Sequence, residues 1–390
     1  MSFSGLQQLA DDLASRDAQQ LRRRRRVLQS AQGPRVDADN ASLLHFGSND
    51  YLGLASDPRL IAAVRQAALR WCVGAGASHL VSGHFAPHDA LEQELASWVA
   101  SCADARALLF SSGYLANLAI LTTLAAHGDA VFADKTNHAC LNDGAILSRA
   151  DFLRYPHQDL SRLEERLAGS RARRRVICTD AVFSMDGDIA AIPALLGLAE
   201  KYDAWLVVDD AHGFGVLGEG RGTLAHFGIA SERIVYMGTL GKAAGVAGAF
   251  VVAHPIVIET LIQRARSYVF TTGAPPLLAA ALLESLAVVR AEPQRRAHLF
   301  ALVRRWRDAA LDLPWRVLES ATPIQPVVIG SAAEALRVSD ALWRRGVWVP
   351  AIRPPTVPQD TARLRITLSA AHTEGDVDAL VDALHAVAAQ

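Results

Sequence analysis

The chain has 390 residues, of which 51% are hydrophobic and 20% are charged, and its formal net charge is -1. A chain of this length and apolar content can bury a large core, so we expect two domains, or one large domain with appendages. The balanced charge gives no reason to expect a nucleic-acid partner, and no segment is long and uncharged enough to predict a membrane span.

Residues 1–45 predict an N-terminal helical arm followed by one strand. The opening "MSFSGLQQLADDLASRDAQQ" is polar and amphipathic, and it lacks the apolar core of a signal peptide. The arginine run "LRRRRR", Leu21 to Arg26, predicts either a solvated basic face on a helix or a binding surface, and the sequence leaves both open. The segment "SLLHF" has the apolar pattern of a strand.

Residues 46–275 predict a large α/β domain. Short apolar runs rich in valine and isoleucine alternate with helical segments, which indicates a mostly parallel sheet covered by helices on both faces. The predicted strands are "ALLF", "DAVFAD", "RRRVICTDAVF", "AWLVVDD", "RIVYMGTL" and "GAFVVA". Among the helices, "SSGYLANLAILTTLAAHG" is expected to have Ser111 or Ser112 as its N-cap and to stop at Gly128, and "IPALLGLAEKY" predicts another.

Residues 276–390 predict a smaller C-terminal α+β domain, because the pattern changes after Pro275 and Pro276. Two long helices, Leu277–Arg290 and Pro293–Leu311, come first. The strand candidates "IQPVVIG", "VWVPAI" and "RLRITLSA" follow, with a further helix after the first of them.

Several polar residues follow predicted strands, at the edge where open α/β sheets bind their ligands. They are Asp180, Ser184, Asp209, Asp210, His212 and Thr239, together with Gly113 and Tyr114 at a helix N-terminus that suits a phosphate. Taken singly, residues of these types are more often turn formers or helix caps. The functional prediction depends on all of them meeting at one edge of one sheet.

Lys242 is one of only three lysines, with Lys135 and Lys201, and it lies in "GTLGKAAGVAG", a stretch of otherwise small or apolar residues. Arginine cannot replace a lysine that must lose its proton and attack a carbonyl. Together with a carboxylate at a strand end and a phosphate site on a helix, this lysine predicts a site for pyridoxal phosphate, whose ring acts as an electron sink. Asp209 and Ala211 are expected to share a face of their strand, so that Asp209 reaches the ring nitrogen while Ala211 lies under the ring.

Other kinds of site are not predicted. The four cysteines, Cys72, Cys102, Cys140 and Cys178, form no CxxC pair, so we expect neither a zinc site nor a disulfide framework, and a reducing cytoplasm fits. The segment "GTLGKA" lacks the glycine spacing and the following Ser or Thr of a P-loop. In "HFAPH", His84 to His88, Pro87 interrupts the helix and the glutamate of a zincin motif is missing, so no metal is expected.

A set of motifs that runs nearly from end to end carries a resemblance to a known family. The motifs are "SNDYLGL", "HLVSGH", "LFSSGYLAN", "NHACLNDGA", "VFSMDGD", "VVDDAHGFGVLGEGRG", "TLGKAAGVAGA", "AIRPPTVP" and "ARLRITLSAAH". In combination they resemble the α-oxoamine synthases of the fold-type-I pyridoxal phosphate superfamily. The resemblance implies a fold-type-I transferase fold and pyridoxal 5'-phosphate as the cofactor.

The resemblance also implies a role for each matching residue. Lys242 would bind the cofactor covalently and move the substrate's α-proton. His138 would stack on the cofactor's ring, and Asp209 would pair with the ring nitrogen. Hydrogen bonds to its phenolic oxygen would come from His212 and Ser184, and its phosphate would be held by Thr239 with Gly113 and Tyr114. Around the substrates, Arg365 with Asn49 would bind the amino acid carboxylate, Thr356 would touch the bound substrate, and Arg22 would meet the far end of an acyl chain. The catalytic set is then Lys242, His138, Asp209 and His212.

Three residues depart from the family pattern. Asp180 stands where the family often has glutamate, one methylene longer, so its role is left open. Ala243 and Ala244 follow the lysine where the family commonly has glycine, and a Cβ there restricts the backbone.

The motifs "AIRPPTVP" and "ARLRITLSAAH" point to the family members of biotin biosynthesis, which implies that L-alanine is joined to a pimeloyl thioester with loss of CO2. The resemblance further implies a homodimer with shared active sites, in which Thr271 and Thr272 reach the partner's phosphate. The carrier of the thioester, coenzyme A or acyl carrier protein, is left open. Three alternatives remain: a sister synthase making 2-amino-3-oxobutyrate, 5-aminolevulinate or a sphingoid base; an aminotransferase; and a binding protein without catalysis.

Overall fold

The computed structural model describes residues 4–389, which divide into two compact units. Within this range the first unit comprises residues 4–49, 185–187 and 298–389, and the second comprises residues 50–184 and 188–297. Residues 1–3 of the predicted arm lie outside the described residues. Among the described residues, none of the helices combines the length and the apolarity that crossing a membrane requires.

This division differs from the predicted one of 1–45, 46–275 and 276–390. The arm is part of the first unit, because β2 (Ala41–His45) pairs in parallel with β12 (Val347–Trp348). The boundary expected at residue 275 falls at residue 297. The cause is α11 (Pro276–Ala291), which packs against α2 (Pro58–Trp71) and α3 (Ala86–Val99).

The second unit is built around a seven-stranded sheet of order β3-β9-β8-β7-β6-β4-β5. Its strands are β3 (Arg106–Phe110), β4 (Ala130–Asp134), β5 (Asp151–Tyr155), β6 (Arg175–Asp180), β7 (Ala204–Asp209), β8 (Ile234–Thr239) and β9 (Ala249–Ala253). Only β9 runs antiparallel to its neighbours, which confirms the mostly parallel sheet. The edge strand β5 was not predicted, because its sequence "DFLRY" carries charges at both ends of a very short apolar run.

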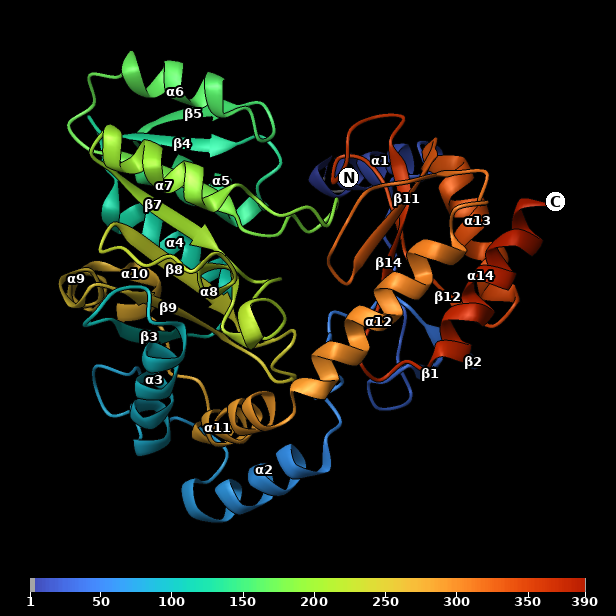
Figure 1. The fold of residues 1–390 in the computed structure, drawn as a ribbon, viewed down its shortest axis with the longest axis horizontal. Coiled ribbons are helices and arrows are strands. Elements are labelled where there is room, and N and C mark those ends of the chain that lie inside the picture. The colour runs from blue at the N-terminus through green and yellow to red at the C-terminus, as the bar shows by residue number, and fades with distance from the viewer. Residues whose placement is uncertain (1–3, 390) are drawn as a thin grey trace. The chain divides into compact units, whose positions relative to one another are not determined.

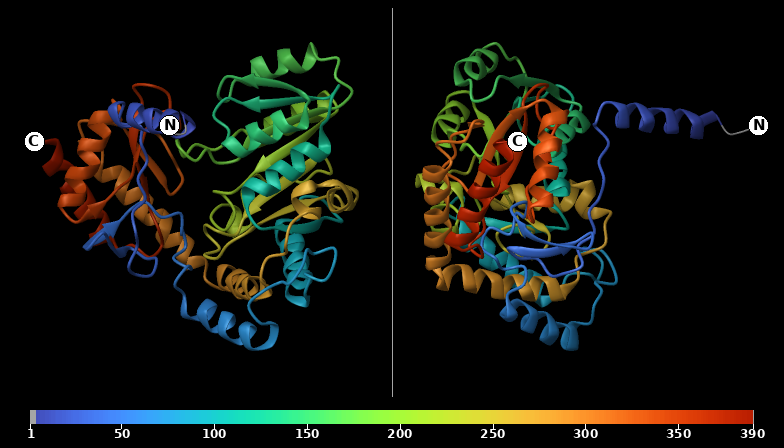
Figure 2. Two further views of the ribbon diagram at one scale, coloured as in Figure 1. Left: turned by 180° about the vertical axis from the view of Figure 1, so that it is seen from behind. Right: turned by 90° about the vertical axis from the view of Figure 1, so that its right-hand side faces the viewer.

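Helices cover both faces of this sheet (Figures 1 and 2). One face packs against α3, α6 (Leu160–Ala168), α7 (Ile192–Lys201), α8 (Thr223–Phe227) and α11, and the other packs against α4 (Gly113–Leu124), α5 (Ala139–Ser148), α9 (Pro255–Arg264) and α10 (Arg266–Val269). A short 3-10 helix, η1 (Gly218–Gly220), precedes α8. Side chains of β7 alternate between the two faces. Leu206 and Val208 pack in the core on the side of α3 and α7, and Val207 packs in the core on the side of α4 and α5.

Helix α4 begins as its sequence predicts and ends earlier. Ser112 is the N-cap, and its hydroxyl accepts the N–H of Leu115. The helix ends at Leu124 rather than at Gly128. The reason is a turn in which the Asp129 carboxylate accepts the N–H of Ala126 at 3.0 Å, so the chain leaves the helix before the glycine.

The first unit contains two small sheets, of order β1-β2-β12 and β10-β11-β14-β13. Besides β2 and β12, its elements are α1 (Ser4–Ala18), β1 (Arg35–Ala38), most of α12 (Pro293–Ala309), β10 (Arg316–Val317), β11 (Ile324–Gly330), α13 (Ala332–Arg344), β13 (Ala351–Ile352), β14 (Ala362–Thr367) and α14 (Glu374–Ala388). Strand β14 is buried along its whole length between β11 and β13. The predicted α+β character of this region is therefore present.

The arginine run does not lie on a helix. Helix α1 ends at Ala18, Gln20 adopts a positive φ of 57°, and residues 21–27 contain no helix. Five consecutive arginines would place like charges four residues apart on a helix, which is unfavourable. The expectation of a basic helical face at Leu21 to Arg26 is wrong, and these residues form an irregular segment instead.

Candidate active site

Three strand ends of the second unit bring polar side chains together. Strands β6, β7 and β8 are parallel neighbours that end at Asp180, Asp209 and Thr239. All three residues continue the strand positions that face α4 and α5, because Cys178, Val207 and Met237 belong to the core on that side. The predicted convergence at one edge of one sheet is therefore present.

A cavity of about 200 Å³ lies at this edge. It is lined by Gly113, Tyr114, His138, Cys140, Asp180, Ser184, Asp209, Ala211, His212, Met237, Thr239 and Lys242. Every cofactor-site residue predicted from the sequence is in this set. A larger cavity of about 630 Å³, beside α3 and β3, is lined by none of them, so the chemistry of the lining identifies the site better than its size.

Lys242 lies in the turn after β8 and contacts a histidine. Its Nζ is 2.8 Å from Nε2 of His212, and Nδ1 of His212 is 2.6 Å from the hydroxyl of Tyr51. Tyr51 is fully buried. The sequence placed Tyr51 in the motif "SNDYLGL" without a role, and the structure adds it to the site.

The Asp209 carboxylate is fixed by groups from two directions. Oδ2 accepts a hydrogen bond of 2.6 Å from the side-chain amide of Asn117 in α4, and Oδ1 accepts the N–H of Ala211 at 3.0 Å. Cys140 is close to the same carboxylate, and burial together with the charge of Asp209 raises the pKa of its thiol. Sequence reasoning missed Asn117, although an asparagine in the apolar helix "GYLANLAILTTL" was the available signal.

Asp210 serves a different purpose from its neighbour. Its Oδ2 accepts the N–H of Thr223 at 2.6 Å and the hydroxyl of Tyr236 at 2.8 Å. Asp210 is fully buried, and burial raises its pKa to about 7. Successive residues of an extended chain point to opposite faces. Asp209 therefore lines the cavity, whereas Asp210 connects the start of α8 to β8.

Asp180 positions the start of helix α5. Its Oδ2 accepts the backbone N–H of His138 at 2.9 Å, and His138 is the N-cap of α5. Burial, and then the nearby charge of Asp209, raise the pKa of Asp180 well above its ordinary value. The side chain of His138 lies against the cavity, so the shorter carboxylate at position 180 supports the predicted stacking residue through the backbone.

The N-terminus of α4 and the turn after β8 border the same cavity. The first turn of a helix presents N–H groups that have no acceptor within the helix, which suits a phosphate. Gly113 and Tyr114 supply this turn, and Thr239 stands at the end of β8. In the lysine turn the positive φ belongs to Gly245, at 72°, so Ala243 and Ala244 fit without the strain that a Cβ would otherwise cause.

The predicted substrate residues lie in the first unit. In β14, the buried Arg365 donates from Nη1 to Asn49 Oδ1 and Thr367 Oγ1, both at 3.0 Å. Thr356 accepts a hydrogen bond of 3.2 Å from Arg23, and Arg22 forms an ion pair with Asp17. Asn49 and Arg365, which the resemblance paired, are therefore in direct contact.

The two arginines of "ARLR" have different partners. Arg363 forms an ion pair with Asp186 and donates to the carbonyl of Met185 at 3.2 Å. Arg365 contacts the side chains of Asn49 and Thr367. The resemblance assigns Arg365, and not Arg363, to the substrate.

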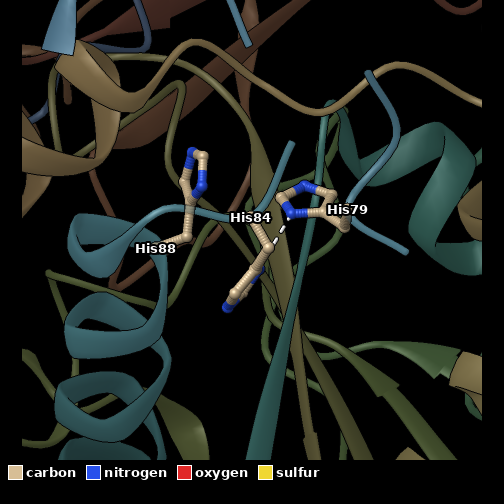
Figure 3. A group of neighbouring side chains, drawn as sticks. All are labelled: His79, His84 and His88. Carbon is tan, nitrogen blue, oxygen red and sulfur yellow. Dashed lines mark hydrogen bonds between the residues drawn. The ribbon is translucent and has the colours of Figure 1, made fainter. Parts of the chain in front are cut away.

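A histidine group in the second unit meets the distance criterion for a metal site but not its chemistry. One ring nitrogen from each of His79, His84 and His88 lies within 4.8 Å of the other two (Figure 3). The N–H of Phe85 donates to Nδ1 of His88 at 3.1 Å, so neutral His88 carries its hydrogen on Nε2 and offers no lone pair. His79 and His84 are hydrogen-bonded to each other through Nδ1 at 3.0 Å. The absence of a metal site stays a prediction.

The cavity fits pyridoxal phosphate by its donor set. It combines an amine on Lys242, a buried carboxylate on Asp209 that is held by an amide, and a helix N-terminus at Gly113. These groups match the aldehyde, the ring nitrogen and the phosphate of that cofactor. The fold and this donor set define the class: a fold-type-I transferase that uses pyridoxal phosphate.

Comparison with known proteins agrees with this class. Residues 41–384 match the family model "Aminotransferase class I and II". A serine palmitoyltransferase from S. paucimobilis, solved with bound PLP, superposes with a TM-score of 0.91 at 27% identity, covering 99% of this chain and 98% of that one. An 8-amino-7-oxononanoate synthase from Francisella tularensis gives a TM-score of 0.77 at 31% identity, covering 89% and 97%.

Sequence relatives narrow the assignment further. The 8-amino-7-oxononanoate synthase of Herminiimonas arsenicoxydans is 57% identical over 384 residues, which cover 97% of this chain and 98% of the relative. The chain belongs to the 8-amino-7-oxononanoate synthases, pyridoxal-phosphate-dependent acyltransferases within the class I and II aminotransferase family.

Proposed function

We propose that the enzyme condenses L-alanine with a pimeloyl thioester and releases CO2, the free carrier and 8-amino-7-oxononanoate, for biotin biosynthesis. The observation that carries the proposal is the Lys242–His212 pair in a cavity with Asp209, in a chain 57% identical to a relative named for this product.

The residues of the cavity divide the chemistry among themselves. Pyridoxal phosphate, when bound, supplies an electron sink for the charge that develops at the substrate's α-carbon. Asp209 holds a proton at the cofactor's ring nitrogen, and His138 covers the ring. His212 and Ser184 form hydrogen bonds with the phenolic oxygen, and Thr239 with the first turn of α4 binds the phosphate. Lys242 Nζ takes the proton from the α-carbon and later returns one.

The residues of the first unit bind the two substrates. Arg365 binds the carboxylate of alanine through two parallel hydrogen bonds, and Asn49 orients its guanidinium. Thr356 contacts the substrate. Arg22 meets the far carboxyl end of the pimeloyl chain. Arg353 supports this arrangement, because it donates to the carbonyls of Gln20 and Arg22.

The enzyme acts as a homodimer with shared active sites, with Thr271 and Thr272 reaching the phosphate bound by the partner subunit. Helix α1 supports an association between copies, because Leu6, Leu9 and Leu13 are exposed and recur at helical spacing on one face. Light scattering of the wild type and of Leu9→Glu tests this: the wild type is a dimer, and a monomeric wild type would contradict the proposal.

The enzyme works in the cytoplasm. All four cysteines are free, and three of them are buried, which suits a reducing compartment. The acyl carrier is coenzyme A or acyl carrier protein, and the exposed arginine segment offers a surface for either anionic carrier.

The test is mass spectrometry of the product formed by holoenzyme from L-alanine and pimeloyl thioesters of both carriers. The expected result is 8-amino-7-oxononanoate with one CO2 per product. Acetyl, succinyl and palmitoyl thioesters should react at least about 100-fold more slowly, since matching a chain of several methylenes is worth a few kcal/mol. Preference for one of these would indicate a sister synthase, and amino transfer without CO2 would indicate an aminotransferase.

A further inference from the structure

His157 follows the edge strand β5 and lies between two carboxylates of the second unit. Its Nε2 is 2.8 Å from Oδ2 of Asp188, and its Nδ1 is 3.1 and 3.2 Å from the two oxygens of Asp134. Asp134 is buried at the end of β4, and the His157 side chain is partly exposed. His157 therefore joins the segment that follows β4 to the segment that follows β6.

The segment after β4 leads directly to His138 in the cofactor cavity. The Asp134 carboxylate closes its first turn, because Oδ1 accepts the backbone N–H of Thr136 at 2.8 Å and the hydroxyl of Thr136 at 2.7 Å. Two residues later, His138 caps helix α5 and lines the cavity. Asp134 thereby sets the direction in which the chain approaches His138.

The segment after β6 carries Ser184. It turns back on itself through a bond of 3.0 Å from the N–H of Phe183 to the carbonyl of Asp188. The ring of His157 stands edge-on to the buried ring of Phe183, with centroids 4.4 Å apart and an interplanar angle of 90°. Ser184 is the next residue and lines the cavity. His157 thus contacts this turn at two residues, one of them directly beside Ser184.

Both ring nitrogens of His157 face acceptors. An ionised carboxylate only accepts hydrogen bonds, so Nε2 carries a hydrogen toward Asp188 and Nδ1 carries one toward Asp134. The Thr136 hydroxyl is 2.7 Å from Nδ1 and also 2.7 Å from Asp134 Oδ1, to which it donates. Burial acts to lower the pKa of His157, but hydrogen bonds to Asp134 and Asp188 outweigh burial and raise that pKa to about 10. The ring is therefore an imidazolium at neutral pH.

Gln158 binds the same two carboxylates. Its backbone N–H donates to Asp134 Oδ2 at 2.7 Å, and its side-chain amide donates to Asp188 Oδ2 at 2.6 Å. Both carboxylates keep these bonds when His157 is replaced by glutamine, so His157→Gln is expected to fold. The substitution removes the positive charge and the two-sided contact of the ring.

We propose that His157 is a positioning residue: as an imidazolium between Asp134 and Asp188, it holds the turn that carries Ser184 against the segment that carries His138. His138 is also held by Asp180, so loss of the imidazolium releases the Ser184 turn. The inference deepens the proposed function, because it rests on Ser184 as a residue that binds the phenolic oxygen of the cofactor.

The direct test of the charge is ¹⁵N NMR of histidine-labelled apoenzyme at pH 8, which needs neither cofactor nor substrate. The wild type should show an imidazolium signal that is missing from His157→Gln. An imidazole with the ordinary pKa of about 6.5 is neutral at this pH. A neutral His157 in the wild type would overturn the proposal, even if the variant does not fold and whichever reaction the enzyme catalyses.

The test of positioning is a double-mutant cycle on the affinity of apoenzyme for pyridoxal phosphate, measured by fluorescence titration. His157→Gln and Ser184→Ala should each weaken binding by about 3–10-fold, the effect of losing an ordinary hydrogen bond. Because His157 acts through Ser184, the double variant should bind within about twofold of Ser184→Ala. If the two losses multiply instead, His157 acts without Ser184 and the proposal is wrong.

His127→Gln is the matched control, because His127 is exposed in the same unit and is not among the residues that line the cavity. It should keep the wild-type affinity for the cofactor, and a loss as large as that of His157→Gln would refute a specific role for His157. Failure at Ser184 has its own signature. Wild-type affinity in Ser184→Ala would refute the proposed cofactor contact of Ser184 and with it this inference, whereas multiplied losses refute the role of His157 alone.

Discussion

The cofactor cavity of the second unit and the arginine site of the first unit hold their charged groups in different ways. Asp209 and Lys242 stand at or after the ends of β7 and β8, where the backbone changes direction. Arg365 lies inside β14, with a strand on either side, and two side chains fix its guanidinium. The proposed binding group, Arg365, is thus built into a strand, whereas the proposed proton-transfer group, Lys242, stands on a turn at the rim.

The largest effect is expected at the lysine. Lys242→Ala removes the covalent attachment and the base, so turnover should fall by at least about 10³-fold, while cofactor still binds weakly. Borohydride reduction of wild-type holoenzyme followed by peptide mapping should label Lys242. Label on Lys135 or Lys201 instead would refute the assignment.

The neighbouring aspartates of β7 should separate catalysis from stability. Asp209→Asn keeps the fold but should slow the exchange of the α-proton of alanine by about 10²–10³-fold, because an amide cannot hold a proton at the ring nitrogen. Asp210→Asn, whose side chain contacts Thr223 and Tyr236, should leave this exchange within a few-fold of wild type. NMR in deuterated water measures the rate of this proton exchange in both variants. Slow exchange in Asp210→Asn together with near-normal exchange in Asp209→Asn would mean that the wrong carboxylate has been chosen.

Substitutions of the two arginines of β14 should likewise separate an effect on substrate binding from an effect on stability. Arg365→Lys should weaken alanine binding by about 10–100-fold, because an ammonium cannot form two parallel hydrogen bonds with a carboxylate. Arg363→Lys alters the ion pair with Asp186 and should lower the melting temperature while alanine affinity stays within about twofold. Titration of holoenzyme with alanine, followed by cofactor absorbance, measures both. Equal losses of affinity would remove the distinction.

A smaller effect concerns pH. Burial raises the pKa of Asp210 to about 7 from an ordinary value of 3.8. Between these values the folded state binds more protons than the unfolded state, so this group's contribution to stability is lost as pH rises towards 7. Asp210→Asn cannot titrate, so its melting temperature should fall less than that of wild type between pH 4 and pH 7, by a few degrees. Calorimetry tests this, with the exposed Asp382→Asn as a control that keeps the wild-type slope.

The smallest effect is expected in the arginine segment. Arg24 and Arg25 are exposed, so their attraction for an acidic carrier protein is long-range and is screened over about 8 Å at physiological salt. Reversing both charges should raise the KM for the carrier-protein thioester a few-fold, and high salt should mimic the change. Arg22→Ala should instead impair any pimeloyl substrate with a free carboxyl group, nearly independently of salt. Identical behaviour of all three positions would leave only a solvated basic surface.

The sequence determined the central sheet and the residues that line the cavity at its edge, because both have strong local signals. Apolar runs the length of a buried strand predicted β7 and β8, and each ends in a polar residue that only a sheet edge accommodates. Lys242 was identifiable because a lysine among small residues has few structural uses. Ser112 was identifiable as a helix cap, and the structure confirms it.

Only the tertiary structure decided the contacts between segments that are distant in the chain. Asn117 meets Asp209, and Tyr51 meets His212, across 92 and 161 residues respectively, and no local pattern encodes such pairs. The helix expected at Leu21 to Arg26 does not form, although arginine has a high helix propensity. Five adjacent like charges and the turn at Gln20 oppose it. The boundary of the second unit moved to residue 297 because packing of α11 on α2 and α3, and not composition, assigns that helix.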